Sequence, residues 1–170
     1  MGDRTHALIM IGGHLETVAD TELFLRMMSE STFDNQDINS WTSALREAIE
    51  ENRYLEDEDS EVNYGTFDDY EAAVKAAPGM GCSTYFDAGG GYGAGVRTIM
   101  PDKTEHQCST DDGVMVGLLA LIEARKNANP LTAIDDLIER THIAAGDSLP
   151  KMTASPSVHS YLKIFGRKTA

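Results

Sequence analysis

The chain is short of basic residues, of cysteine and of long hydrophobic runs. Of its 170 residues, 14 are lysine or arginine against 28 aspartate or glutamate, so the formal net charge is −14. Binding to nucleic acid needs cationic groups that neutralise phosphates, and this balance argues against it. The same balance disfavours an anionic membrane surface and favours a basic partner protein.

No apolar run approaches the roughly 18 residues of a membrane span. The N-terminal sequence MGDRTHALIMIGG has only a short apolar segment, Ala7 to Ile11, and no cleavage-like site, so no signal peptide is expected. The two cysteines, Cys82 and Cys108, are therefore expected to be reduced thiols in a cytoplasmic protein.

Length and composition fit one soluble domain. A chain of 170 residues can bury a sizeable core but is short for two domains. We therefore expect residues 1–170 to form a single domain, with a flexible loop near 147–157 and a frayed C-terminus.

A glycine-rich stretch, CSTYFDAGGGYGAGVRTIMP at 82–101, predicts a β-hairpin near the middle of the chain. Aromatic and β-branched residues on either side of the glycines suit two strands. Glycine also reaches the positive φ values that hairpin turns use. Gly89, Gly91 and Ala94 match the letters of a dinucleotide-binding fingerprint, which needs a helix after the loop. The following residues instead predict a strand that ends at Pro101.

Anion binding is the alternative interpretation of this loop. A nest of glycine amides can hold an anion, with an arginine nearby. The candidate ligand-binding residues are Gly89, Gly90, Gly91, Tyr92, Gly93 and Arg97. They would belong to a protein or enzyme that binds a small molecule or nucleotide.

The remaining segments predict both strands and helices. An apolar run at 6–12 predicts a buried strand, and further strands are expected at 104–109 and, as an edge strand, at 158–165. Apolar residues at helical spacing predict helices near 18–30, from residue 40 to about 50, from 67 to 77, over 113–127, and from 130 to just before 146.

These elements predict an α+β fold. We expect an antiparallel or mixed sheet of four to five strands, with helices packed mainly on one face. The helix over 113–127 carries a broad apolar face and is expected to pack on the sheet.

The negative charge is concentrated in one part of the chain. Between Glu47 and Glu71 there are eleven acids and one base, Arg53, which leaves −10 of the net −14 in this part. Part of this charge has a structural explanation. Acids are favoured in the first turn of a helix, and residues 56–61 could be a solvated loop. The candidate partner-binding residues are Glu47, Glu50, Glu51, Glu56, Asp57, Glu58, Asp59, Glu61, Asp68 and Asp69.

No motif indicates a catalytic site or a metal centre. The histidines lack the spacing of a metal-binding helix, and no serine lies in a nucleophile elbow. His106, Cys108 and Cys82 lack the paired spacings of a zinc site. Neither a metal nor a cofactor is expected, and an enzyme is the less favoured class, although catalytic residues need not be close in sequence.

The leading hypothesis is a non-catalytic acidic binding protein. It would occlude a basic, nucleic-acid-binding surface of a partner protein, as an inhibitor or an immunity-type protein does. The alternative is a small-molecule or nucleotide binder, or an enzyme, that uses the loop at 89–95. A third reading is a structural protein whose acidity maintains solubility. The sequence carries no signal for an oligomeric state.

Overall fold

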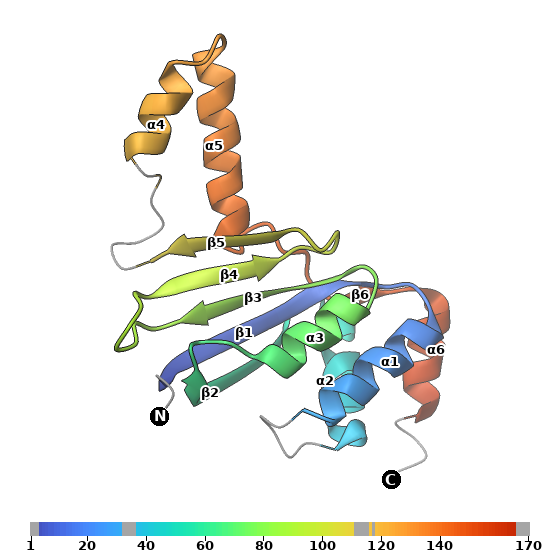
Figure 1. Ribbon diagram of the computed structural model, residues 1–170. Coiled ribbons are helices and arrows are strands. Elements are labelled where there is room, and N and C mark those ends of the chain that lie inside the picture. Colours follow the sequence, from blue (N-terminus) through green and yellow to red (C-terminus); the bar gives the residue numbers. More distant parts are fainter. Residues whose placement is uncertain (1–3, 32–36, 111–115, 117, 166–170) are drawn as a thin grey trace.

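The protein is described here by a computed structural model, which covers residues 4–31, 37–110, 116 and 118–165. Strands and helices are interspersed along this part of the chain, and the strands form one open sheet (Figure 1). The elements are β1 (Arg4–Leu15), α1 (Val18–Ser29), α2 (Ile38–Glu50), β2 (Leu55–Asn63), α3 (Asp68–Ala76), β3 (Met80–Phe86), β4 (Gly95–Ile99), β5 (Glu105–Ser109), α4 (Leu118–Arg125), α5 (Pro130–Ala144), β6 (Thr153–Ala154) and α6 (Pro156–Phe165).

The sheet has the strand order β2-β1-β3-β4-β5, and neighbouring strands in this order are antiparallel. The short strand β6 adds to the end of β1 in parallel, so the sheet is mixed. The predicted α+β class, with its hairpin at β3 and β4 and a further strand at β5, is confirmed.

One face of the sheet carries the core. Alternate residues of β1, including Ile9 and Ile11, are buried beneath α1, α2, α3 and α6, which lie together on that side (Figure 1). Tyr70 of α3 stacks on Phe67 and meets the edge of Trp41 of α2, so aromatic rings fill the space between these helices. The prediction that helices pack mainly on one face is confirmed.

The other face is crossed by the chain that follows α5. The hydroxyl groups of Tyr85 and Thr98 donate to the carbonyl oxygens of Ala145 and Ala144, at 3.0 and 3.2 Å. Gly146 then adopts a φ of +83°, and a Cβ there would lie 2.6 Å from the Tyr85 hydroxyl. Glycine therefore allows the chain to turn off the end of α5, as predicted, while it stays in contact with the strands.

Two secondary-structure predictions were wrong. Residues 158–165 form α6 and not an edge strand, because Val158 and Leu162, one helical turn apart, are both buried. Residues 56–61 form part of β2 and not a solvated loop, because they pair with β1. The predicted loop at 147–157 contains β6 and the fully buried Met152, and the predicted frayed end at 166–170 lies outside the described residues.

The helices α2 and α3 begin differently. Asp37 caps α2, where cap residues were expected at Asn39 or Ser40 from the sequence, and its side chain accepts from the amide of Ser40 at 2.8 Å. The start of α3 has no side-chain cap, although the sequence offers Thr66 there, and the hydroxyl of Thr66 donates to the carbonyl oxygen of Asn63.

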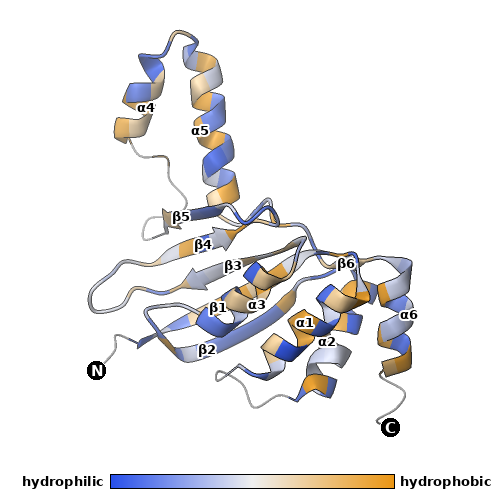
Figure 2. Ribbon diagram, turned by 45° about the vertical axis from the view of Figure 1, so that its right-hand side comes forward, coloured by the Kyte–Doolittle hydropathy of each residue, from blue (hydrophilic) through white to orange (hydrophobic). Residues whose placement is uncertain are grey.

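The two helices α4 and α5 form a hairpin that projects from the β5 side of the sheet (Figure 1). The expectation that the helix over 113–127 packs on the sheet is wrong for its described part, because no residue of α4 is buried and α4 contacts α5. Residues 113–115 and 117 lie outside the description. Figure 2 shows hydrophobic residues along both helices of this projection.

Candidate functional site

Five of the ten candidate partner-binding acids lie on β2, which forms one edge of the sheet. Asp57 and Asp59 are paired with Ile9 and Ala7, whose side chains face the helix layer, and therefore point to that side. The intervening residues Glu56 and Glu58 point to the opposite side. We call these four consecutive acids the acidic edge, and they display carboxylates on both sides of one strand.

Two acids of the acidic edge also bind backbone amides of their own strand. The carboxylates of Asp57 and Asp59 accept from the amides of Glu58 and Glu61, each at 2.9 Å. Asp57 further accepts from the hydroxyl of Tyr70 at 2.8 Å. Charged side chains that bind edge amides make strand addition by another chain unfavourable, so this edge is suited to contact through side chains.

The other candidate acids are placed at the two ends of β2 and on α3. Glu47 and Glu51, at the end of α2, form ion pairs with Arg53 at 3.1 and 2.9 Å, while Glu61 pairs with Arg4. Glu50 is exposed near the end of α2. Asp68 and Asp69 occupy the first turn of α3, where the helix dipole favours acids. The ten acids are thus spread over the end of α2, the length of β2 and the start of α3.

The glycine-rich loop joins β3 to β4 without left-handed backbone. Within the described chain, positive φ among glycines occurs at Gly13, Gly65, Gly79 and Gly146. The expectation that the loop glycines supply positive φ values for the turn was therefore wrong. Gly95 is required by close packing instead, because a Cβ there would lie 2.7 Å from the ring of Phe86 and 2.8 Å from the carbonyl oxygen of Cys108.

Part of the alternative site is brought together in a hollow of about 640 Å³ beside this loop. We call it the loop hollow. It is lined by three predicted residues, Tyr92, Gly93 and Arg97, whereas Gly89, Gly90 and Gly91 are not in its lining. The amide of Gly89 donates to the carbonyl oxygen of Tyr92 at 3.0 Å, which removes one donor from the predicted nest.

Sequence reasoning missed the lining residues of the loop hollow that lie outside the loop and Arg97, among them Tyr64, Phe86 and Gln107. Tyr92 lies between the first two, with ring centroids 6.4 Å from Tyr64 and 5.9 Å from Phe86. Gln107 is the cross-strand neighbour of Arg97 and could have been found only with the register of β4 and β5 known.

The charge of Arg97 is already balanced from α3. Its guanidinium forms an ion pair with Glu71, which is 7% exposed and also accepts a long hydrogen bond of 3.4 Å from Thr84. The Nε of Arg97 is buried and has no hydrogen-bond partner among the described residues. An anion in the loop hollow would therefore meet one unused donor, but it would compete with a carboxylate for the positive charge.

A second hollow, of about 470 Å³, lies on the other face of the sheet and was not predicted. Leu8, Tyr85 and Val96 line it together with Asp147. Burial raises the pKa of the Tyr85 phenol, and the nearby negative charge of Asp147 raises it further. The phenol remains protonated and donates to a backbone carbonyl, so it is a structural group.

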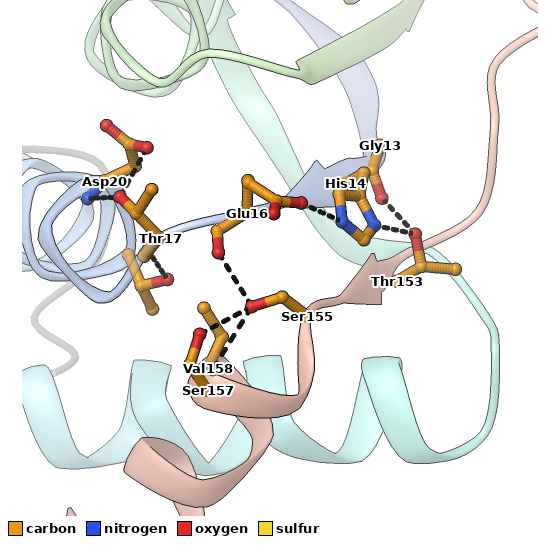
Figure 3. A network of polar contacts seen from close by, with 10 residues as sticks. Gly13, His14, Glu16, Thr17, Asp20, Thr153, Ser155, Ser157 and Val158 are labelled. Atoms are coloured by element: carbon orange, nitrogen blue, oxygen red, sulfur yellow. Dashed lines mark hydrogen bonds and ion pairs between the residues drawn. The ribbon is translucent and has the colours of Figure 1, made fainter.

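A polar network joins β1 to β6 and to the start of α6 (Figure 3). The ring of His14 lies 2.9 Å from both the Thr153 hydroxyl and the Glu16 carboxylate, an order that resembles a catalytic triad. However, Thr153 donates its hydrogen to the carbonyl oxygen of Gly13 at 3.2 Å, so it accepts from His14 and is not activated as a nucleophile. Ser155 donates to the carbonyl oxygen of Glu16 at 2.7 Å, and the network therefore ties the two segments together.

Within the described ranges, no three or more histidine, cysteine, aspartate and glutamate side chains are grouped closely enough to hold a metal ion. The same residues include no helix that is long and apolar enough to cross a membrane. Comparison of the chain with protein-family models, with curated proteins and with solved structures finds no significant match. Function is therefore inferred from the chain's own residues.

Proposed function

We propose that this protein binds a basic surface of a partner protein through the acidic edge of β2, and that it occludes a surface otherwise used for nucleic acid. The observation that carries this proposal is the position of four consecutive acids on an edge strand. Glu56 and Glu58 are exposed on one side of the strand, and Asp57 and Asp59 are half-buried on the side of the helix layer.

Counted along the strand and over both of its sides, these charges follow one another at nearly the spacing of phosphates in one strand of duplex DNA. A β-strand advances about 3.3 Å per residue. Along one strand of duplex DNA, phosphates follow each other about every 3.4 Å of the helix axis. The acidic edge thus presents nearly the same linear charge density over four residues, and a basic surface would be steered towards it as towards a phosphate backbone.

The experiment compares association with a labelled polylysine peptide over a series of salt concentrations. The test variant combines Glu56→Gln, Glu58→Gln and Asp59→Asn, which remove three charges and keep the acceptor oxygens. Asp57 is retained because Tyr70 donates to it. We expect the variant to bind more weakly at low salt and to show a flatter dependence of affinity on salt.

The matched control removes three acids from the other end of the molecule. It combines Glu123→Gln, Asp136→Asn and Glu139→Gln, all at exposed positions of α4 and α5. The control has the same net charge as the test variant and should bind polylysine nearly as the unaltered protein does. Equal weakening by both variants would mean that only the net charge matters, and the proposal would then be rejected.

A nucleotide in the loop hollow is the second candidate function. The observation in its favour is that Tyr64, Tyr92 and Arg97 line one hollow, with aromatic faces for a base and one unused Nε donor for a phosphate. A thermal-shift screen with nucleotides and inorganic phosphate tests it, because a ligand of the native state raises the melting temperature. The Tyr64→Ser variant, at a position 61% exposed, should abolish the shift without loss of the core. No shift with any of these compounds would count against this candidate.

A further inference from the structure

Among the described residues, five large hydrophobic side chains are exposed on the projecting hairpin of α4 and α5, namely Leu119 and four others. Leu118 and Ile122 of α4 are 71% and 41% exposed, and Leu131 and Ile138 of α5 are 79% and 43% exposed. Monomeric proteins rarely leave contiguous apolar patches in water, and such patches mark sites of interaction.

These four side chains lie on the same side of the hairpin. The two helices contact each other, and the half-buried positions along their seam include Leu121 of α4 and Leu137 of α5. At 100° per residue, Leu118 and Ile122 lie about a quarter turn or slightly more from the α4 seam. Leu131 and Ile138 lie about a quarter turn from the α5 seam. In both helices these residues are reached from the seam by turning in the direction in which the residue numbers increase around the helix. Because the helices run antiparallel, this brings both pairs to the same side of the hairpin, which we call the hairpin face.

The opposite side of the hairpin differs in character. It forms a shallow groove lined by small and charged residues, among them Ala120, Glu123, Asp136 and Arg140. Leu119 belongs to neither side, because it points away from α5 and is 78% exposed. Exposed apolar side chains therefore gather on one side of the hairpin only, where Arg125 also lies, as expected of a helix pair that binds another surface.

We propose that the hairpin face binds the hairpin face of a second copy of this chain, so that four helices pack together in a symmetric dimer. Charge is the first reason for this choice of partner. Residues 118–144 carry four acids and three bases, a net charge of −1, whereas the whole chain carries −14. Two copies therefore meet with the least repulsion at this hairpin. A basic partner would be attracted to the other end instead.

The size of the hairpin face is the second reason. The 15 residues of α5 extend about 22 Å and the 8 residues of α4 about 12 Å, and each helix is about 10 Å across, so the face projects over roughly 340 Å². This is below the roughly 600 Å² per partner of the smaller stable interfaces, and it suits a weak contact between two copies. The hairpin face is hollowed beside Ile138, where Val116, Thr141, His142 and Asp147 line a pocket of about 200 Å³ that can receive a side chain from the other copy. The carboxylate of Asp147 lies 3.3 Å from the ring of His142. A two-fold axis allows each copy to bury the same residues.

Sedimentation velocity over a range of protein concentrations tests the proposal on the full chain. We expect a species of twice the 18.5 kDa chain mass, which dissociates on dilution. The variant with Leu118→Gln and Leu131→Gln should sediment as a monomer at every concentration. Both positions are more than two-thirds exposed, and glutamine is a good helix former, so its circular dichroism spectrum should be unchanged.

The control is Leu119→Gln, which makes the same chemical change at the neighbouring position of the same helix. It should remain dimeric because Leu119 lies outside the hairpin face. A wild-type chain that is monomeric at all concentrations would overturn the proposal, and so would a dimer that survives the double substitution. Dissociation by Leu119→Gln to the same extent would show that general hydrophobicity, and not this face, drives association.

Discussion

Two ion pairs join α3 to the strands beside it, and they differ mainly in burial. Glu71 pairs with Arg97 of β4, and their side chains are 9% and 25% exposed. One helical turn later, Lys75 pairs with Glu105 of β5 at 2.7 Å, and these side chains are 45% and 51% exposed. The comparison of Glu71→Gln with Glu105→Gln therefore measures how burial changes the contribution of an ion-paired carboxylate to the free energy of unfolding.

The expected losses of stability differ severalfold. Removal of one partner from a buried ion pair typically costs about 3–5 kcal/mol, because the remaining charge is left without compensation. Arg97 keeps some access to water, and the glutamine oxygen can still accept from it, so we expect Glu71→Gln to cost about 2–3 kcal/mol. The exposed pair should contribute less than about 1 kcal/mol, so Glu105→Gln should be nearly neutral.

Urea unfolding at one fixed protein concentration gives the two free energies. The measurement is repeated at high salt, where the small contribution of the exposed pair should disappear while the cost of Glu71→Gln remains. The Arg97→Met variant combined with Glu71→Gln should be less unstable than the sum of the single changes, because neither charge is then left alone. If Glu71→Gln costs no more than Glu105→Gln, the buried pair does not stabilise the contact of α3 with the sheet.

The remaining predictions concern the buried Cys82 thiol and the half-buried Lys103. Burial raises the pKa of the Cys82 thiol from 9.0 to about 12, so a thiol reagent should modify Cys108 first and Cys82 only on unfolding. As the pH rises, the thiol of the unfolded chain loses its proton before the thiol of the folded chain does. The free energy of unfolding should therefore fall between about pH 9 and 12, and it should fall less in Cys82→Ala. Urea unfolding at each pH measures this free energy. Lys103 donates to three backbone carbonyl oxygens at 2.7–2.8 Å, so Lys103→Met should lower the unfolding free energy by about 2 kcal/mol or more, measured by urea unfolding. An unchanged urea midpoint would contradict this role for Lys103.

The elements with strong local signals could be predicted from the sequence. The central hairpin and the strand at 105–109 were found because their residues favour strands and because turn residues separate them. The stretch at 158–165 was misassigned because Val158, Tyr161 and Ile164 are compatible with both strand and helix. Burial of Val158 with Leu162 against the core decides in favour of the helix, and such burial is a property of the tertiary structure.

The strand β2 and the pairing of Glu71 depend on contacts that are distant in sequence. β2 has apolar residues only at Leu55 and Val62, and the acids between them suggest a loop; it is a strand because β1 supplies its hydrogen bonds. Glu71 was counted only as one of the eleven acids between residues 47 and 71, yet it faces Arg97, which lies 26 residues later. No local pattern indicates such a partner, and the register of the sheet is needed to find it.

The two proposed surfaces lie at opposite edges of the sheet and can act independently. β2 forms one edge and β5 the other, with three strands between them, and neighbouring strands are about 4.8 Å apart. The hairpin of α4 and α5 projects from the β5 side (Figure 1), so a dimer formed through it leaves the acidic edge of each copy free. The separation also fits the distribution of charge. Acids near the hairpin face would repel the acids of a second copy. At β2 the acids only make it unfavourable for a strand of another chain to add to the sheet edge. A chain with this arrangement can associate with itself at one end and bind a cationic partner at the other.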